Sequence, residues 1–119
     1  MLDRSHRLTG SRDFSAALRR SRRAGTLTLV VHLADPSEDD ATRPARVGFV
    51  VGRGVGKAVT RNQVKRRLRP LVRDRLRSLP DGSVLVVRAL PAAADAVSSV
   101  LAADLDDALR RLAARGGRR

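Results

Sequence analysis

Several residue types are absent or rare in this chain of 119 residues. It has no cysteine, which excludes disulfide bridges, thiolate metal sites and a cysteine nucleophile. It has no tryptophan or tyrosine and only two phenylalanines, so few side chains can stack on a base. No apolar run approaches the roughly 18 residues of a transmembrane helix, and the first residues lack the apolar stretch of a signal peptide. We therefore expect a cytoplasmic protein.

Acidic residues are also scarce relative to basic ones. The chain has 25 Lys and Arg against 12 Asp and Glu, for a net charge of +13. Such an excess repels itself in a compact state, which favours a polyanionic partner, with nucleic acid first and an anionic membrane surface second. Hydrophobic residues make up 42% of the chain, which favours a folded protein over a disordered tail. We expect one RNA-binding domain over residues 1–119, with flexible ends at 1–7 and 115–119.

The spacing of apolar residues predicts alternating helices and strands. Helical spacing is found over residues 13–20 and 96–114. Runs of β-branched and apolar residues predict strands at 26–34, 45–53 and 84–90, and the last run is so apolar that it should be a central strand. Together with a helix from about Thr60, this order predicts a small α+β sandwich in which helices pack on a sheet.

The second and third predicted helices each carry an apolar stripe. The stripe of the second helix is Val64, Leu68, Leu71 and Val72, and that of the third is Val97, Val100, Leu101, Leu105, Ala108, Leu109 and Leu112. Thr60 and Gln63 fit a capping box, in which each side chain satisfies a free backbone amide at the start of a helix. Pro70 should kink this helix without ending it.

The side of the second helix opposite its apolar stripe is basic. With residues placed about 100° apart, one strip contains Asn62, Arg66, Arg69 and Arg73, flanked by Lys65 and Arg77. Solvated helix faces usually alternate charges, whereas this strip repels itself over several turns. Arginine can hold a phosphate through two parallel hydrogen bonds, and each neutralised phosphate releases counterions. The strip therefore favours a nucleic-acid partner over a simple solvated surface.

Motifs for catalysis and for metal binding fail in this sequence. "GRGVGK" lacks the spacing of a phosphate-binding loop, because Val51 stands where glycine is needed and Ala58 follows Lys57. His6 and His32 have no nearby acidic pattern that would complete a metal site, and the acids at 104–107 decorate a helix. No residues fit a nucleophile, base and orienting group. We expect no catalytic residue and no metal ligand here, so that chemistry belongs to a partner.

One segment resembles a known family. "GKAVTRNQVKRRLR" (56–69), following "RVGFVV" (46–51), resembles the bacterial ribonuclease P protein component. That family has a strand, a glycine-bearing loop and a helix that opens R-N-x-x-K-R-x-x-R; the matching residues here are Arg61, Asn62, Lys65, Arg66 and Arg69. "VLVVRALPA" (84–92) also fits, as do Leu8, Ser11, Asp13, Phe14 and Leu18. The resemblance covers about residues 8–112.

The resemblance implies a protein subunit of ribonuclease P, the RNA–protein endonuclease that removes the 5′ leader of precursor tRNA. The RNA would be the catalyst, with Mg²⁺ bound mainly by the RNA and the substrate, and the protein would bind that RNA one to one. The implied fold has three helices on a three- to four-stranded sheet with a left-handed β-α-β crossover, similar to the second domain of a small-subunit ribosomal protein.

The resemblance also implies two sets of binding residues. The set facing the catalytic RNA is Arg61, Asn62, Lys65, Arg66, Arg69 and, on the same strip, Arg73. The set lining a groove for the leader is Phe14, Leu18, His32, Val50 and Arg53. Gln63 stands where the family often has arginine, and Leu18 and His32 stand where it often has aromatic residues. Leader binding should therefore depend more on phosphate contacts. A structural ribosomal-type RNA-binding protein and a nonspecific DNA-compacting protein are the alternatives.

Overall fold

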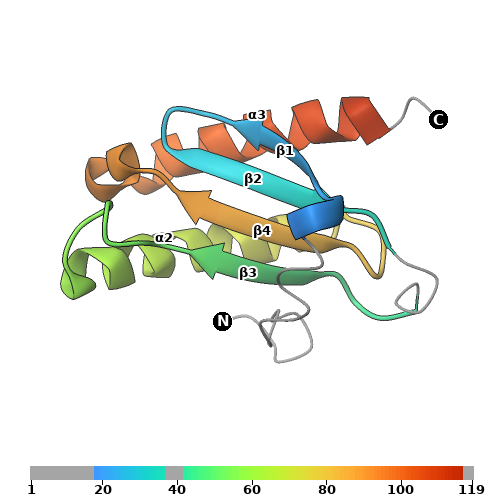
Figure 1. Cartoon of the computed structure of the whole chain (residues 1–119), viewed down its shortest axis with the longest axis horizontal. Coiled ribbons are helices and arrows are strands. Elements are labelled where there is room, and N and C mark those ends of the chain that lie inside the picture. The colour runs from blue at the N-terminus through green and yellow to red at the C-terminus, as the bar shows by residue number, and fades with distance from the viewer. Residues whose placement is uncertain (1–17, 37–41, 117–119) are drawn as a thin grey trace.

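A computed structural model describes residues 18–36 and 42–116 of the chain. Two long helices cover one face of a four-stranded sheet (Figure 1). The strands are β1 (Arg22–Gly25), β2 (Leu29–Ala34), β3 (Arg46–Val50) and β4 (Val84–Ala89). The helices are α2 (Ala58–Leu76), α3 (Ser98–Gly116) and a short 3₁₀ helix, η3 (Pro91–Asp95). Residues 18–20 are also helical, and the rest of the helix expected at 13–20 lies outside the described residues. The predicted α+β class is confirmed.

The strands lie in the order β1-β2-β4-β3, and only the β3–β4 pair is parallel. Helix α2 connects these two parallel strands. In Figure 1, α2 lies behind the sheet, both strands run to the left, and β4 lies above β3, so the crossover is left-handed. About 98% of such connections are right-handed. The left-handed crossover and the central position of the last strand are both confirmed.

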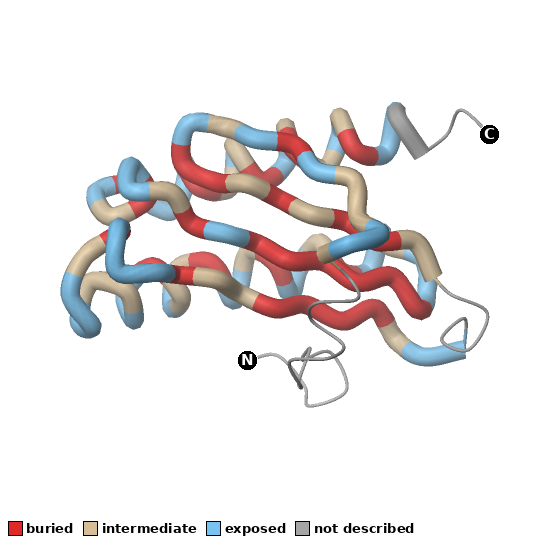
Figure 2. Tube along the Cα trace, in the orientation of Figure 1, coloured by how far each residue is buried: buried red, intermediate tan, exposed pale blue. Residues whose placement is uncertain are grey.

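The hydrophobic core lies between the sheet and the two long helices. Alternate residues of the central strands point into it, among them Leu29 and Val31 of β2 and Leu85 and Val87 of β4, each at most 1% exposed. The helices contribute Val64, Leu68, Val72 and Leu76 from α2, and Leu101, Leu105, Ala108 and Leu112 from α3. Figure 2 shows these buried positions recurring along the strands and on the helix sides that face the sheet. Each large aliphatic side chain buried there stabilises the fold by about 1.5–3 kcal/mol.

The first predicted strand is part of a hairpin. Strand β2 begins at Leu29 and not at residue 26, and residues 22–25 form β1, which was not predicted. Thr26 closes the turn: its backbone amide donates to the Leu29 carbonyl (2.7 Å), and its hydroxyl accepts from the Leu29 amide (3.0 Å). Strand β3 ends at Val50, short of the predicted residue 53, because a turn begins at Arg53.

The predicted capping box at Thr60 and Gln63 is wrong. Helix α2 begins at Ala58, and its N-cap, Lys57, makes no side-chain capping bond. Gly56 has a φ of 152°, and a Cβ there would lie 3.1 Å from the Thr60 Cβ. The loop therefore approaches the first turn of α2 at a position that only glycine fills without strain.

Two further expectations about the helices have different outcomes. Pro70 lies inside α2, which continues to Leu76, so the expectation that this proline does not end the helix is confirmed. Helix α3 spans 98–116 and not 96–114, and Val97 and Val100 are 60% and 42% exposed. These two valines do not belong to the core stripe as predicted: Val97 precedes α3, and in the first turn of the helix Leu101, and not Val100, is the buried residue.

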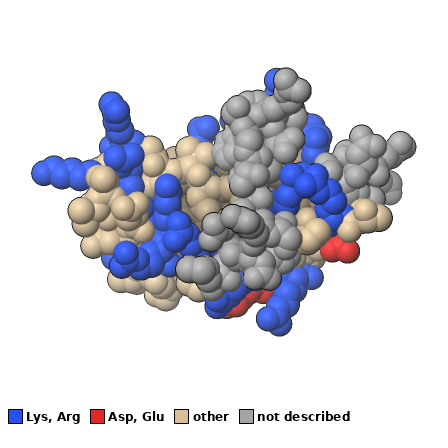
Figure 3. Space-filling view, turned by 90° about the horizontal axis from the view of Figure 1, so that it is seen from below, with Lys and Arg blue, Asp and Glu red and all other residues tan. Residues whose placement is uncertain are grey.

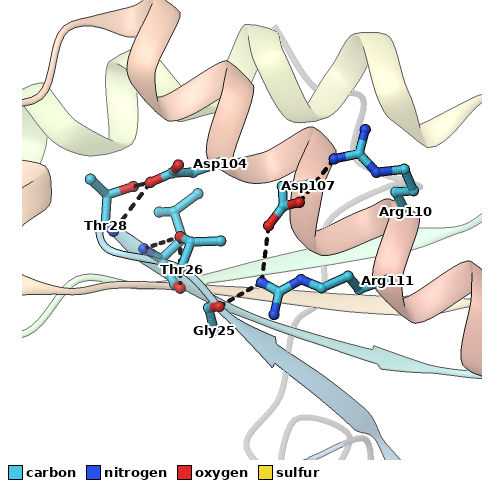
Figure 4. Close-up of polar contacts among 8 residues, drawn as sticks. Gly25, Thr26, Thr28, Asp104, Asp107, Arg110 and Arg111 are labelled. Atoms are coloured by element: carbon cyan, nitrogen blue, oxygen red, sulfur yellow. Dashed lines mark hydrogen bonds and ion pairs between the residues drawn. The ribbon is translucent and has the colours of Figure 1, made fainter.

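The acids of α3 have structural roles that the sequence did not indicate. Asp104 accepts hydrogen bonds from the Thr28 hydroxyl (2.5 Å) and the Thr28 backbone amide (3.2 Å). Asp107 pairs with Arg111 (3.2 Å), which also donates to the Gly25 carbonyl (2.5 Å) (Figure 4). Polar contacts thus tie the middle of α3 to the β1–β2 turn.

Substitution of Asp104 tests this junction. Asp104→Ala should lower the free energy of unfolding by about 1–3 kcal/mol, because the hydroxyl of Thr28, a residue only 2% exposed, loses its acceptor. Urea denaturation followed by circular dichroism measures the change. Asp95→Ala removes the same charge from an exposed position in η3 and should change the midpoint little. Equal effects of the two substitutions would contradict a specific role for the Asp104 contact.

Candidate nucleic-acid interface

Cationic side chains line the side of α2 that faces away from the sheet. The buried residues Val64, Leu68, Val72 and Leu76 fix the rotation of the helix, so the residues between them point outward. The outward set comprises Asn62, Arg66, Arg69 and Arg73, which are exposed, and Lys65, which is partly buried. Arg61 precedes the buried Val64 by three residues and lies on the apolar side of the helix, where its Nε is buried. We call these six residues the basic strip. The structure therefore places five of the six positions predicted to face an RNA on the outer side of α2, with Arg61 beside them in the first turn.

The basic residues of α2 divide into two groups by their partners. Arg75 donates two hydrogen bonds to Asp106 of α3 (2.5 and 3.0 Å), and Arg67 donates to the Ala96 carbonyl (3.3 Å). Within the described part of the chain, Arg61, Lys65, Arg66 and Arg69 make no side-chain hydrogen bond or ion pair. Arg73 has one long contact with Asp74 (3.6 Å). The strip thus keeps its charge available, whereas the arginines outside it hold α2 to its neighbours.

Arg75 and Asp106 join the two long helices. The Arg75 guanidinium and the Asp106 carboxylate form a bidentate ion pair between α2 and α3. The hydrogen bond from Arg75 lowers the pKa of Asp106, and the same bond raises the pKa of Arg75.

The face of the sheet opposite α2 and α3 carries the residues predicted to line a leader groove. Leu18 and Val50 pack against a small cluster formed by Ala34, Val84 and Val86. His32 lies on the same face, since it alternates along β2 with the core residues Val31 and Leu33. Arg53 is exposed in the turn after β3. Phe14 lies outside the described residues. Leu18, His32 and Val50 thus share one surface, here called the open face.

Two basic residues of the open face were missed in the sequence. Arg23 pairs with His32 across β1 and β2, and Arg88 pairs with both Val30 of β2 and Val50 of β3. The signal for Arg88 was present, because it is the one charged residue within "VLVVRAL" and alternates with residues of the core. Arg23 gave no such signal, because β1 itself was not predicted.

His32 is partly buried between these arginines. Its Nδ1 lies 3.4 Å from the Ser21 hydroxyl, and its Nε2 is buried and has no hydrogen-bond partner among residues 18–36 and 42–116. Burial, with the charges of Arg88 and Arg23, lowers the pKa of His32. The imidazole is therefore neutral at pH 7, and an anion beside it would favour its protonated form.

Basic residues outnumber acidic ones on the side of the molecule where β3 and α2 lie. Figure 3 looks onto this side, where Lys and Arg are spread over the surface and Asp and Glu appear only in small areas. Among residues 18–36 and 42–116, no three His, Asp or Glu side chains are grouped so that they could hold a metal ion. Within the same ranges, no helix has the length and apolar character needed to cross a bilayer.

Comparison with known proteins gives one consistent result. The sequence model of the family Ribonuclease P matches residues 2–113. The ribonuclease P protein component of a Nocardioides strain is 58% identical over 114 residues, which cover 96% of this chain and 97% of that protein. That of Streptomyces bikiniensis is 54% identical over 123 residues, covering 99% of this chain and all of the relative.

Solved structures show the same fold. A mutant RNase P protein from Staphylococcus aureus superimposes with a TM-score of 0.78 at 22% identity, over 89% of this chain and 86% of that one. The RNase P protein from Thermotoga maritima superimposes with a TM-score of 0.70 at 26% identity, over 89% of this chain and 94% of that one.

The two groups of α2 arginines should differ in their effect on stability. Arg75→Ala should lower the free energy of unfolding by about 1 kcal/mol near neutral pH, because it removes the pair with Asp106. Arg66→Ala removes the same charge from an exposed position and should not lower the free energy of unfolding. The pKa of Asp106 is depressed in the folded state, so the stabilisation is fully present above the ordinary aspartate pKa of about 3.9 and is lost as the pH falls through the lower pKa of the folded state. Urea titrations at pH 7 and at several pH values below that ordinary pKa measure both effects; a difference in the free energy of unfolding that does not shrink toward low pH would contradict the ion pair.

Proposed function

Since the chain belongs to the ribonuclease P protein family, we propose that it binds the RNA subunit of ribonuclease P through the basic strip of α2. The observation that carries this proposal is the division among the α2 cations. Arg61, Lys65, Arg66 and Arg69 make no side-chain hydrogen bond or ion pair with described residues, whereas Arg67 and Arg75 are held by η3 and α3. Several unpaired cations on one helix side repel each other unless an anion lies between them.

The helix offers more than charge. Arginine side chains can hold phosphates through two parallel hydrogen bonds, and Asn62 in the first turns of α2 carries an amide that suits a base edge or a ribose hydroxyl. No side chain caps the N-terminus of α2, so its first backbone amides and the positive end of the helix dipole favour a phosphate. The basic strip and the N-terminus of α2 together provide positions for several consecutive phosphates.

The open face of the sheet is proposed to hold the 5′ leader of precursor tRNA. Leu18 and Val50, which are partly buried and pack against the buried Val86, provide apolar surface on which a single strand can lie in an extended conformation. Arg53, together with Arg88 and His32, provides positive or protonatable groups at its margins. With few aromatic residues in the chain, leader binding depends mainly on phosphate contacts.

Bond cleavage in this proposal belongs to the RNA. Mg²⁺ has oxygen ligands and is commonly bound through phosphates, so the RNA and the substrate supply its ligands. The protein binds the RNA one to one in the cytoplasm and reduces the repulsion between two polyanions, the RNA subunit and its substrate. It also positions the leader, so that the bond to be hydrolysed lies at the catalytic RNA.

Assembly with ribonuclease P RNA tests the function. The purified complex should remove the leader from precursor tRNA, and the protein alone should not cut at any Mg²⁺ concentration. Arg66→Ala should weaken RNA binding about tenfold, or about 1.4 kcal/mol, and reduce the dependence of log affinity on log salt by about one phosphate. Filter binding between about 50 and 200 mM salt measures both.

Arg110→Ala is the matched control for assembly. Arg110 lies on α3, its side chain is 74% exposed, and its loss removes the same charge from a different surface. Equal weakening by both substitutions would show that only total charge matters and would contradict the basic strip as the interface. Co-sedimentation with ribosomal subunits in place of ribonuclease P RNA would favour a ribosomal-type RNA-binding protein.

Leader binding should strengthen as the pH falls from about 8 to about 5.5, because a leader phosphate near His32 stabilises the imidazolium whose pKa the protein otherwise lowers. Among the described residues, the polar and charged groups that interact with His32 are Ser21, Arg23 of β1 and Arg88 of β4. If the pKa of His32 changes by one unit on binding, the affinity changes by at most about tenfold.

The measurement is the fluorescence anisotropy of labelled precursor tRNA titrated with the assembled complex. His32→Gln, which cannot be protonated, should bind the leader with little pH dependence. Mature tRNA without a leader serves as the control substrate. A pH dependence that is the same for both tRNAs would contradict the contact between His32 and the leader.

A further inference from the structure

A shallow cavity of about 440 Å³ lies between α2 and the start of α3. Its lining residues are Gln63, Arg66, Arg67, Pro70 and Leu71 of α2 and Ser98 of α3. The cavity belongs to the helical layer, so the sheet separates it from the open face. It is therefore distinct from the surface proposed for the leader.

The cavity adjoins the basic strip. Gln63, Arg66 and Pro70 follow one another at intervals of three and four residues, which places them on one line along α2. Arg66 belongs both to this line and to the basic strip. A strand whose phosphates lie on the strip thus passes along the edge of the cavity.

The lining combines apolar walls with polar groups. Pro70 and Leu71 supply apolar surface, and none of the described residues that line the cavity is acidic. Arg67 donates to the Ala96 carbonyl (3.3 Å), which holds its guanidinium between α2 and the segment before α3. Gln63 is exposed and is the one side-chain amide of the lining, so it offers both a donor and an acceptor.

The start of α3 adds a further polar element. Ser98 is the first residue of this helix, and the backbone amides of Ser98 and Ser99 have no acceptor among the described residues. The positive end of the α3 dipole is therefore next to the cavity. Val97, which precedes Ser98 in the chain, is 60% exposed and provides additional apolar surface.

We propose that this cavity takes one unpaired nucleobase of the partner RNA, with an adjacent phosphate on Arg66. The apolar walls and the planar guanidinium of Arg67 suit the faces of a base, and the amide of Gln63 suits its hydrogen-bonding edge. A phosphate alone would gain nothing from Pro70 and Leu71. The volume lies within the roughly 300–1,000 Å³ of small-ligand pockets. The proposal rests on the proposed function, since it names a contact within the same protein–RNA complex.

Two neighbouring serines provide a matched test. Ser98→Tyr places a large side chain in the cavity, whereas Ser99→Tyr makes the same change at the next residue, which is exposed and does not line it. Ser98→Tyr should weaken binding of ribonuclease P RNA about tenfold. The slope of log affinity against log salt should stay the same, because no phosphate contact is lost. Ser99→Tyr should bind like the unsubstituted protein.

Gln63→Ala keeps the test decisive if Ser98→Tyr does not fold, because alanine is well tolerated on an exposed helix surface. It should weaken RNA binding about fivefold without changing the salt slope. Thermal melting of each free protein checks the fold.

Three outcomes would overturn the proposal. The first is equal RNA affinity of the Ser98→Tyr and Ser99→Tyr proteins, together with no effect of Gln63→Ala. The second is a reduced salt slope in Ser98→Tyr, which would identify a phosphate site in place of a base site. The third is failure of the unsubstituted protein to bind ribonuclease P RNA, which would overturn the proposed function as well; the first two outcomes leave that function intact.

Discussion

The packing of α2 against the sheet determines the rest of the surface. Four aliphatic residues of this helix are buried, and their spacing allows only one rotation of the helix about its axis. That rotation places five polar or charged residues of the basic strip on the solvent side together. It also directs Arg67 and Arg75 toward η3 and α3, where they find acceptors. The same apolar contacts that stabilise the domain therefore also decide which cations remain available to a partner.

The central strand β4 has two roles in alternating positions. Leu85, Val87 and Ala89 enter the core, while Val84, Val86 and Arg88 belong to the open face. A domain of this size has few strands, so each strand must provide residues to the core on one side of the sheet and to the open face on the other. Substitutions that change the volume of the core residues would shift the open face as well, because both sets share one backbone.

The sequence predicted those parts of the fold that follow from regular spacing. The stripe of α2, its basic strip and the central position of β4 depend on periodicity and on composition, and all were found. It did not predict β1, because an edge strand with two adjacent arginines lacks the apolar alternation of the others. It placed the start of α2 too late, because a glycine with positive φ at residue 56, and not a side-chain cap, precedes the helix. The partners of Asp104 and Asp106 depend on contacts between distant segments, which local patterns do not encode.

The hand of the β3-α2-β4 connection has a further consequence. Its mirror-related alternative, a right-handed connection between the same two parallel strands, would carry α2 to the other side of the sheet. There it would pack on the open face of β3 and β4, which carries Val50 and Arg88, and the core side of these two strands would lose the cover of α2. The rarer topology thus places both long helices on one face of the sheet, and the residues of the other face are not covered by either of them.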